Sequence, residues 1–254
     1  MRNGIYLDID MDFFTEPIYK ASVDNIRLYH DKEGSCMSVA PLVDKLKQKG
    51  LSWEGSKISC FTNHKVSYTH WWIAKRSNNL LIHIDAHSDL YRNRNKDLGQ
   101  LHNGDLGCYN YIWYAIRDGY VDEVYWVIPD SMKELLIEEK ATEIISNDLI
   151  KKVWKNEEGL HIQMECIVIT GEPKHIPVHI CTMEQLPQFD AFCTKVTIAT
   201  SPEFMSAACD ELIFELLESF EAPKELAHNI YKQHKDMLSK TPEELQSAWE
   251  KLNK

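Results

Sequence analysis

Two short apolar segments of the sequence each end in closely spaced acidic residues. Residues 4–12 read GIYLDIDMD, and residues 80–89 read LLIHIDAHSD. Successive side chains of a β-strand point to opposite faces, so residues two positions apart share a face while the chain stays extended. Each segment therefore gathers its acidic groups on one face. Buried carboxylates that lie side by side are unfavourable unless a proton or a cation neutralises them, so both segments indicate strands that end at a polar site.

The second segment places Asp85, His87 and Asp89 at alternate positions directly after its apolar strand. In an extended chain these three side chains converge on one point. A bound metal ion is the most economical explanation, because it neutralises the carboxylates and accepts the imidazole as a ligand. The alternative interpretation is a turn whose aspartates are solvated.

The first segment has the same alternation, with Asp8, Asp10 and Asp12 on one face and Ile9 and Met11 directed to the core. Its alternative interpretation is an exposed edge strand with an acidic face. Both predicted sites lie at the carboxyl end of a strand, where ligands bind in parallel α/β sheets.

His64 follows a third predicted strand, residues 57–61, in the string FTNH. A single histidine is more often structural than a metal ligand, but this one also stands at the carboxyl end of a strand. Imidazoles and carboxylates without thiolates favour Mn, Fe or Zn. Five or six such ligands are too many for one tetrahedral zinc and suit two metal ions about 3.5–4 Å apart, which lower the pKa of a water molecule.

Hydrophobic periodicity predicts strands that alternate with helices along one domain, residues 1–254. Such alternation implies an α/β fold, a mainly parallel sheet with helices on both faces. We expect further strands over 123–128 and 195–200, several short strands over 151–186, a loop over 90–107, and helices over 38–49, from about 70–75, and over 108–118, 131–140, 206–220, 225–238 and 241–253.

Composition restricts the partners. The formal net charge is -11, from 39 acidic and 28 basic residues, which argues against nucleic acid and anionic membranes and suits a cationic partner, although solubility alone also explains it. No apolar run approaches the ~18 residues of a membrane span. Seven scattered cysteines without a CxxC pair, and acidic residues within the first ten positions, lead us to expect a cytoplasmic protein with reduced thiols and no signal peptide.

The motifs resemble those of a known family. DAHSD resembles the DAH-x-D motif of the arginase and agmatinase (ureohydrolase) family, FTNHKVS is similar to its GGDHS segment, and IYLDIDMD resembles its S-x-D-x-D segment. In this alignment Asp10 and Asp12 are the ligand pair and Asp8 takes the serine position; an offset by two makes Asp8 and Asp10 the ligands.

The order of the motifs is permuted, because the second aspartate pair follows DAH-x-D in that family and stands at the N-terminus here. The resemblance still implies a three-layer arginase-like fold, since the strands could lie side by side. The strings LDIDMDFF and HIDAHSDL look more like the protein family UPF0489, whose members include peptide arginases that act on ribosomally made, modified peptides.

This resemblance implies two Mn²⁺ ions per chain, held by Asp10, Asp12, His64, Asp85, His87 and Asp89. It implies hydrolysis of peptidyl arginine to peptidyl ornithine and urea, with an arginine-containing precursor peptide as the partner; it leaves homo-oligomerisation open.

Asp89 and His102 are the implied proton-transfer residues. Glu203 is the implied contact to the guanidinium group, and Asp8 is the second implied substrate-binding residue. A carboxylate can pair with a guanidinium through two parallel hydrogen bonds. The simpler interpretations are a surface loop for His102 and the start of a helix for Glu203.

Two other functions fit the same residues. The first is hydrolysis of a small free guanidino compound or an acetylated amine by the same metals. The second is a metal-binding partner protein without catalytic turnover.

Overall fold

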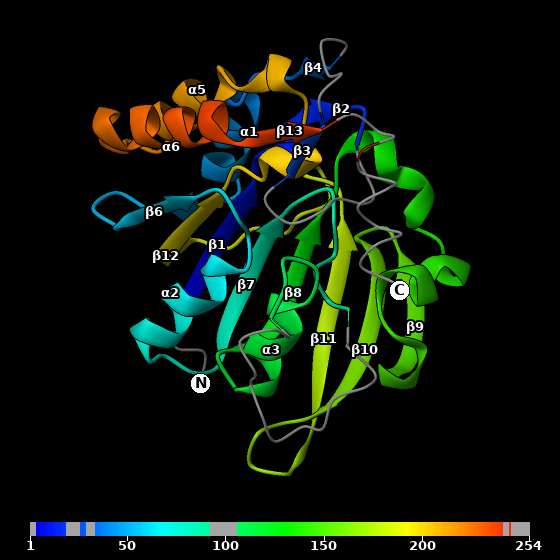
Figure 1. Ribbon diagram of the computed structural model, residues 1–254. Helices are drawn as coiled ribbons and strands as arrows, with labels where there is room; N and C mark the ends of the chain where they lie inside the picture. Colours follow the sequence, from blue (N-terminus) through cyan, green and yellow to red (C-terminus); the bar gives the residue numbers. More distant parts are fainter. Residues whose placement is uncertain (1–3, 19–25, 29–33, 92–105, 241–243, 245–254) are drawn as a thin grey trace.

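The computed structural model describes residues 4–18, 26–28, 34–91, 106–240 and 244. Within them, nine strands form one sheet in the order β5-β12-β1-β7-β8-β11-β10-β9, with β6 also paired to β12 (Figure 1). These strands are β1 (Ile5–Asp10), β5 (Leu51–Ser52), β6 (Ile58–Phe61), β7 (Asn79–Ile84), β8 (Val121–Val127), β9 (Ile150–Asn156), β10 (Gly159–Ile167), β11 (Pro173–Cys181) and β12 (Ala191–Ala199).

The sheet is mostly parallel. All pairs from β6 and β5 through β12, β1, β7 and β8 to β11 run parallel, whereas β10 pairs antiparallel with both β11 and β9. The expected several short strands over 151–186 are three longer ones. In β11, buried apolar side chains alternate with polar residues or proline, as at Ile176, Val178 and Ile180. Because of this mixed composition, the sequence did not indicate one continuous strand.

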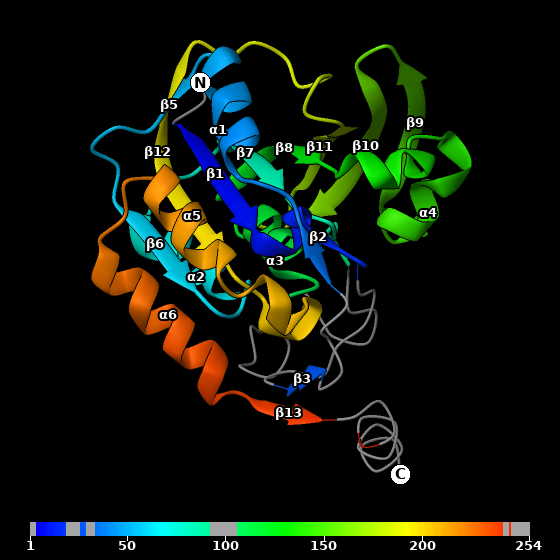
Figure 2. The same cartoon turned by 90° about the horizontal axis from the view of Figure 1, so that it is seen from above.

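Helices cover both faces of the sheet (Figures 1 and 2). On one face, α1 (Ala40–Gln48), α5 (Leu212–Ser219) and α6 (Lys224–Asp236) contribute to one apolar cluster. On the other face, α2 (Val66–Ala74) and α3 (Tyr111–Arg117) contribute to a second. The predicted α/β class, with a mainly parallel sheet between helices, is confirmed.

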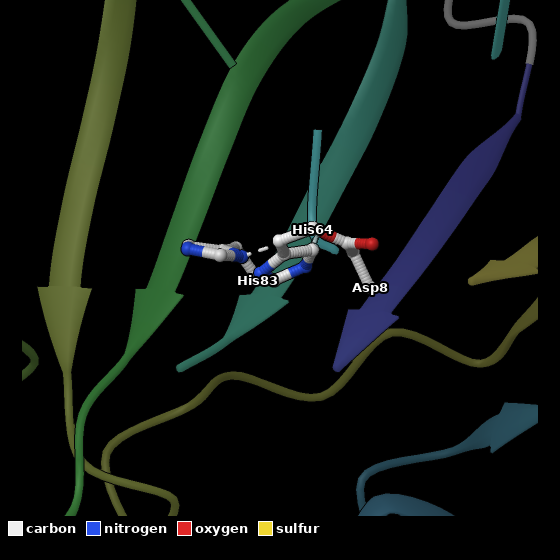
Figure 3. A group of neighbouring side chains, drawn as sticks. All are labelled: Asp8, His64 and His83. Carbon is white, nitrogen blue, oxygen red and sulfur yellow. Dashed lines mark hydrogen bonds and ion pairs between the residues drawn. The ribbon is translucent and has the colours of Figure 1, made fainter. Parts of the chain in front are cut away.

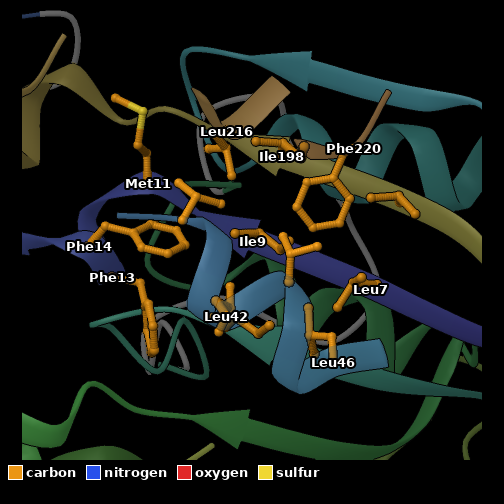
Figure 4. Close-up of a cluster of buried hydrophobic side chains, with 14 of the residues drawn as sticks. Leu7, Ile9, Met11, Phe13, Phe14, Leu42, Leu46, Ile198, Leu216 and Phe220 are labelled. Atoms are coloured by element: carbon orange, nitrogen blue, oxygen red, sulfur yellow. The ribbon is translucent and has the colours of Figure 1, made fainter. Parts of the chain in front are cut away.

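Strand β1 faces both clusters. Leu7 and Ile9 pack against α1 and α5 in the first cluster (Figure 4), because apolar side chains at alternate positions leave water together. Tyr6 points to the opposite face and stacks on Trp71 of α2, with ring centroids 5.6 Å apart. Asp8 and Asp10 continue this second face, so the site lies on the side of the sheet that α2 and α3 cover.

Several predicted helices differ in detail. Helix α1 confirms the prediction over 38–49, and Gly50 ends it with φ 77°. Helix α2 starts earlier than expected, at Val66. The expected helix over 131–140 is wrong, because Ile137 adopts extended backbone between two 3-10 turns.

The shorter elements are β2 (Thr15–Glu16), β3 (Ile26–Leu28), β4 (Ser35–Cys36), β13 (Leu238–Lys240), α4 (Ala141–Ile144) and the 3-10 turns Met11–Phe14, Asp130–Leu135, Glu138–Lys140, Asn147–Leu149, Pro202–Phe204 and Ala207–Cys209. The expected helix over 241–253 lies outside the described residues, apart from position 244. None of the described helices has the length and apolar character that a membrane span requires.

Candidate metal centre

Polar side chains replace apolar ones toward the carboxyl ends of β1 and β7. The two strands are parallel neighbours, with Asp8 in register with His83. The carboxyl ends of β6 and β12 reach the same edge, because Phe61 pairs with Ala199, which in turn pairs with Asp10. The two acidic motifs and His64 therefore meet, as the sequence predicts, in spite of their permuted order.

One group of potential ligands surrounds His64. Its Nδ1 atom lies 3.0 Å from Asp10 Oδ2 and 3.0 Å from Asp85 Oδ2. Asp89 Oδ2 lies slightly farther from the same nitrogen, at 3.4 Å. One imidazole nitrogen and three carboxylate oxygens thus converge on one point, and Asp10, His64 and Asp85 are close enough together to share an ion.

A second group surrounds His87. Its Nδ1 atom lies 2.8 Å from Asp12 Oδ2 and 3.6 Å from Asp85 Oδ1. Asp12, Asp85 and His87 also lie close enough together to hold an ion. Asp85 belongs to both groups, and it turns one oxygen toward each histidine.

The chain does not bring these residues together by simple strand alternation. Strand β1 ends at Asp10, and Asp12 lies in the 3-10 turn that follows, where its backbone N–H donates to Asp10 Oδ1. Strand β7 ends at Ile84, and Asp89 has φ 49°. The expectation of an extended chain through residues 12 and 89 is therefore wrong, and turns direct these carboxylates to the site.

The electrostatics indicate an excess of negative charge. Burial, and then the neighbouring Asp10 and Asp85 carboxylates, raises the pKa of Asp12 to about 8. Burial, and then Asp85, raises the pKa of Asp89 well above its ordinary value. A carboxyl group keeps its proton in this way when no cation shares its site, so both groups would ionise on binding a metal.

The pKa values of the two histidines are also raised, but against the effect of burial. Burial opposes a charge on His64, yet the carboxylates of Asp8 and Asp10 raise its pKa well above 6.5. The pKa of His87 is raised well above the same value, because Asp12 and Asp85 outweigh its burial. Protons here neutralise charge that a metal ion would otherwise neutralise.

Two buried atoms at the centre test whether a metal fits. His64 Nδ1 and Asp85 Oδ2 form no hydrogen bond with acceptable geometry, although they lie 3.0 Å apart. Buried polar atoms are nearly always hydrogen-bonded, and a metal ion between these two would use both as ligands. The described residues could therefore hold a metal ion, and their nitrogen and oxygen atoms suit Mn, Fe or Zn.

Asp8 occupies a different place from the one expected. It is 0 % exposed and does not line the cavity at the site. Its Oδ1 accepts hydrogen bonds from the hydroxyls of Ser67 and Thr197, and its Oδ2 faces His64 Nε2. This position argues against the prediction that Asp8 contacts substrate. Asp10 and Asp12 are favoured as the ligand pair because they approach the Nδ1 atoms of His64 and His87.

Glu203 is also buried, at 2 % exposed. It lies in the 3-10 turn that follows β12, and its neighbours Ser201 and Phe204 line the cavity whereas Glu203 does not. The geometry therefore does not favour Glu203 as a contact to substrate. His102, the other predicted catalytic residue, lies outside the described residues.

Three site residues escaped the sequence analysis. His83 of β7 lies 3.4 Å from Asp85 Oδ2 and stands two positions before Asp85 in the sequence, a signal that its apolar neighbours obscured. Tyr111, inside the predicted helix 108–118, donates to Asp8. Ser201 donates to Asp10 Oδ2 from a left-handed conformation with φ 31°. No pattern in the sequence predicts this conformation.

A cavity of about 800 Å³ opens over the ligand groups. Asp10, His64, Asp85, His87, Asp89 and Ser201 belong to its lining, with apolar and aromatic walls that include Ile18, Tyr91, Tyr109, Leu135 and Phe204 and with the acidic residues Glu16, Glu134 and Glu143. Apolar walls with a few convergent polar groups are typical of a ligand site.

Comparisons of the chain with models of known protein families, with curated proteins and with solved structures find no match. The chemistry of this site therefore has to be inferred from its own residues.

Proposed function

We propose that the protein is a binuclear metal hydrolase that removes urea from arginine residues within peptides. The observation that carries the proposal is the Asp85 carboxylate, which directs Oδ2 toward His64 and Oδ1 toward His87. Carboxylates that bridge two ions are the usual core of two-metal sites. The proposal includes an arginase-like fold and a relationship to ureohydrolases and to UPF0489, which the motifs support.

The residues divide naturally between two ions. His64, Asp10, Asp85 and Asp89 would hold the first, and His87, Asp12 and Asp85 the second. We propose Mn²⁺ for both, because the donors are carboxylates and imidazoles and include no thiolate. When bound, the metals supply positive charge and a water molecule with a lowered pKa.

The reaction adds water across one bond of arginine. The oxygen of water bonds to the guanidinium carbon, the bond from that carbon to the side-chain Nε breaks, and urea and the amine of ornithine form. The leaving nitrogen needs a proton, and Asp89 is the group that we propose for its transfer. Asp89 lines the cavity, and its carboxylate could accept a proton released by the water molecule and pass it to that nitrogen.

The cavity suits a cationic side chain carried by a larger molecule. Asp10, Asp85 and Asp89 lie in its lining, and Glu16, Glu134 and Glu143 belong to the same lining. A volume of about 800 Å³ lies in the upper part of the range for ligand sites, about 300–1,000 Å³. These features support an arginine-containing precursor peptide as the substrate. All seven cysteines are free thiols, which supports a reducing, cytoplasmic setting.

The test is direct. Protein loaded with Mn²⁺ is incubated with an arginine-containing peptide, and urea is measured together with the mass that the peptide loses when arginine becomes ornithine. We expect both products in equal amounts, and none with a chelator or with His87→Ala. A fully metal-loaded protein that releases no urea from any arginine peptide or from free arginine would refute the proposed function.

A further inference from the structure

Asp8 lies next to the metal-ligand groups without belonging to them. It projects from β1 toward His64 and toward His83 of β7 (Figure 3). Asp8 Oδ2 lies 2.9 Å from His64 Nε2, and on the other side of the same ring His64 Nδ1 faces Asp10 and Asp85. The imidazole therefore stands between Asp8 and the ligand groups.

Hydroxyl groups fix the Asp8 carboxylate from three elements. Ser67 at the start of α2 and Thr197 of β12 donate to Oδ1, at 2.6 and 2.5 Å. Tyr111 of α3 donates to Oδ2 at 2.6 Å, and its oxygen lies 2.9 Å from His64 Nε2. All these partners are buried, so water does not compete for the carboxylate.

A neutral imidazole carries one hydrogen, and the partner of one nitrogen decides which nitrogen is left to bind a metal. An ionised carboxylate only accepts hydrogen bonds. The hydroxyls of Ser67, Thr197 and Tyr111 all donate to Asp8, as expected for an ionised carboxylate. Asp8 therefore requires the hydrogen of neutral His64 on Nε2, which leaves the Nδ1 lone pair directed at Asp10 and Asp85.

We propose that Asp8, supported by Tyr111, is a positioning residue that fixes the tautomer and ring orientation of His64 so that Nδ1 binds metal. This inference rests on the proposed metal site and adds a role for a carboxylate that is not itself a ligand. Partners of this kind behind a ligating histidine raise metal affinity about 10–100-fold.

The same residues offer one competing arrangement. Asp8, His64 and His83 lie close enough together to hold an ion of their own. However, Asp8 Oδ2, the oxygen that faces both His64 and His83, already accepts the hydroxyl hydrogen of Tyr111. An ion at this oxygen would have to displace that hydrogen bond, so the geometry favours the positioning role.

Asp8→Asn tests whether Asp8 acts as an acceptor for the hydrogen of His64, because it preserves the size of the side chain and replaces one carboxylate oxygen by an NH₂ group. Because Oδ1 accepts from two hydroxyls, we expect the amide oxygen of asparagine to take that position and the amide NH₂ to face His64 Nε2. The NH₂ group can only donate, so His64 would have to carry its hydrogen on Nδ1, where it blocks the metal. Tyr111→Phe removes one support of Asp8 and preserves the carboxylate, so its effect is smaller.

The experiment measures affinity and tautomer separately. Mn²⁺ affinity is determined by competition with a chelator, and the His64 tautomer by nitrogen NMR of protein loaded with diamagnetic Zn²⁺. We expect hydrogen on Nε2 in the wild type, a loss of affinity of about 10–100-fold in Asp8→Asn, and a smaller loss in Tyr111→Phe without a change of tautomer. Asp190→Asn, the same change at an exposed position, should bind Mn²⁺ like the wild type.

Three results would overturn the inference: hydrogen on Nδ1 of His64 in the Zn²⁺-loaded wild type, wild-type affinity in folded Asp8→Asn, or a third ion per chain that Asp8→Asn removes. If Asp8→Asn does not fold, the His64 tautomer of the wild type and the Mn²⁺ affinity of Tyr111→Phe still test the inference. Failure of the proposed function gives a different result. A protein that binds two ions, has the Asp8-dependent His64 tautomer and releases no urea would refute the proposed reaction and leave the role of Asp8 intact.

Discussion

His87 Nδ1 lies 2.8 Å from Asp12 Oδ2, although 75 positions separate the two residues in the chain. The contact is possible because β1 and β7 are parallel neighbours, so the segments that follow Asp10 and Ile84 leave the sheet at the same edge. The site thus depends on which strands lie side by side and not on the order of the motifs along the sequence. This contact also separates the second ligand group from the first, since Asp12 approaches His87 and Asp10 approaches His64.

The shared position of Asp85 predicts the metal content of variants. Wild-type protein should bind close to two Mn²⁺ per chain. Asp85→Asn should bind fewer than one, because it weakens both groups, whereas Asp12→Asn should retain about one, because only the second group includes Asp12. Elemental analysis after gel filtration measures the content. Two ions retained in Asp85→Asn would show that this carboxylate does not bridge them.

His87→Ala and Asp89→Asn should abolish turnover and leave the fold largely intact. Both residues line the cavity, and neither belongs to the apolar clusters that hold the sheet to its helices. We expect kcat to fall at least ~10²-fold, the lower end of the range for loss of an acid–base group, with a far-ultraviolet circular dichroism spectrum like that of the wild type. His228→Ala, at an exposed position of α6, is the matched control. Normal turnover in either site variant would exclude the DAHSD segment from the reaction.

The metal-free protein should become less stable as the pH rises. The folded state keeps the proton of Asp12 up to about pH 8, whereas the unfolded chain releases it near 3.8. The folded state therefore binds more protons in this window, and stability decreases as the pH rises through it. The raised pKa values of Asp89, His64 and His87 act in the same direction.

Mn²⁺ should remove this dependence, because metal ligands bind in their deprotonated form. The rise in Tm on adding Mn²⁺ should accordingly be larger at pH 8 than at pH 6, as measured by differential scanning fluorimetry at one protein and one metal concentration. An equal rise at both pH values would contradict the electrostatic account of the site.

A buried ion pair outside the ligand groups should make a large contribution to the free energy of unfolding. Arg27 of β3 forms two hydrogen bonds with Asp210, and both side chains are buried. Asp210 also lies 2.9 Å from His234, whose other nitrogen contacts Thr200, the residue before Ser201. Asp210→Asn leaves a buried guanidinium without its counter-charge, so we expect a loss of about 3–5 kcal/mol in the free energy of unfolding.

Urea denaturation monitored by circular dichroism measures this loss. Lys235 contacts the same carboxylate but is 49 % exposed, so Lys235→Ala should cost about 0–1 kcal/mol. Equal losses in the two variants would show that burial of the Arg27 pair has no special effect.

The sequence predicted more of the ligand groups than of their surroundings. The fold class and the meeting of the two acidic motifs followed from strand patterns, which depend on local hydrophobicity. The turns that direct Asp12 and Asp89 into the site did not, because a 3-10 turn and a positive φ depend on contacts that form only in the folded chain. The partners of Asp8 escaped for a similar reason: Thr197 and Tyr111 lie 189 and 103 positions from it, and single hydroxyl groups carry no pattern.

The last prediction concerns the size of the substrate. A site for free arginine needs groups that bind the charged α-amino and α-carboxylate ends, and a peptide bond removes both charges. The described lining of the cavity includes Glu16, Glu134 and Glu143, which would repel a free α-carboxylate, and its walls include Tyr91 and Tyr109. Aromatic walls can pack against a peptide chain without charged clamps.

We therefore expect kcat/KM for arginine within a peptide to exceed that for free L-arginine by at least ~100-fold, equivalent to ~2.7 kcal/mol of differential transition-state binding. Urea release from both substrates at equal Mn²⁺ gives the ratio. An arginine with acetylated amino and amidated carboxyl ends is the matched control, because it lacks the terminal charges without adding chain length; it should fall between the two. Comparable rates for free and peptidyl arginine would leave a metal-dependent ureohydrolase without a preference for peptides.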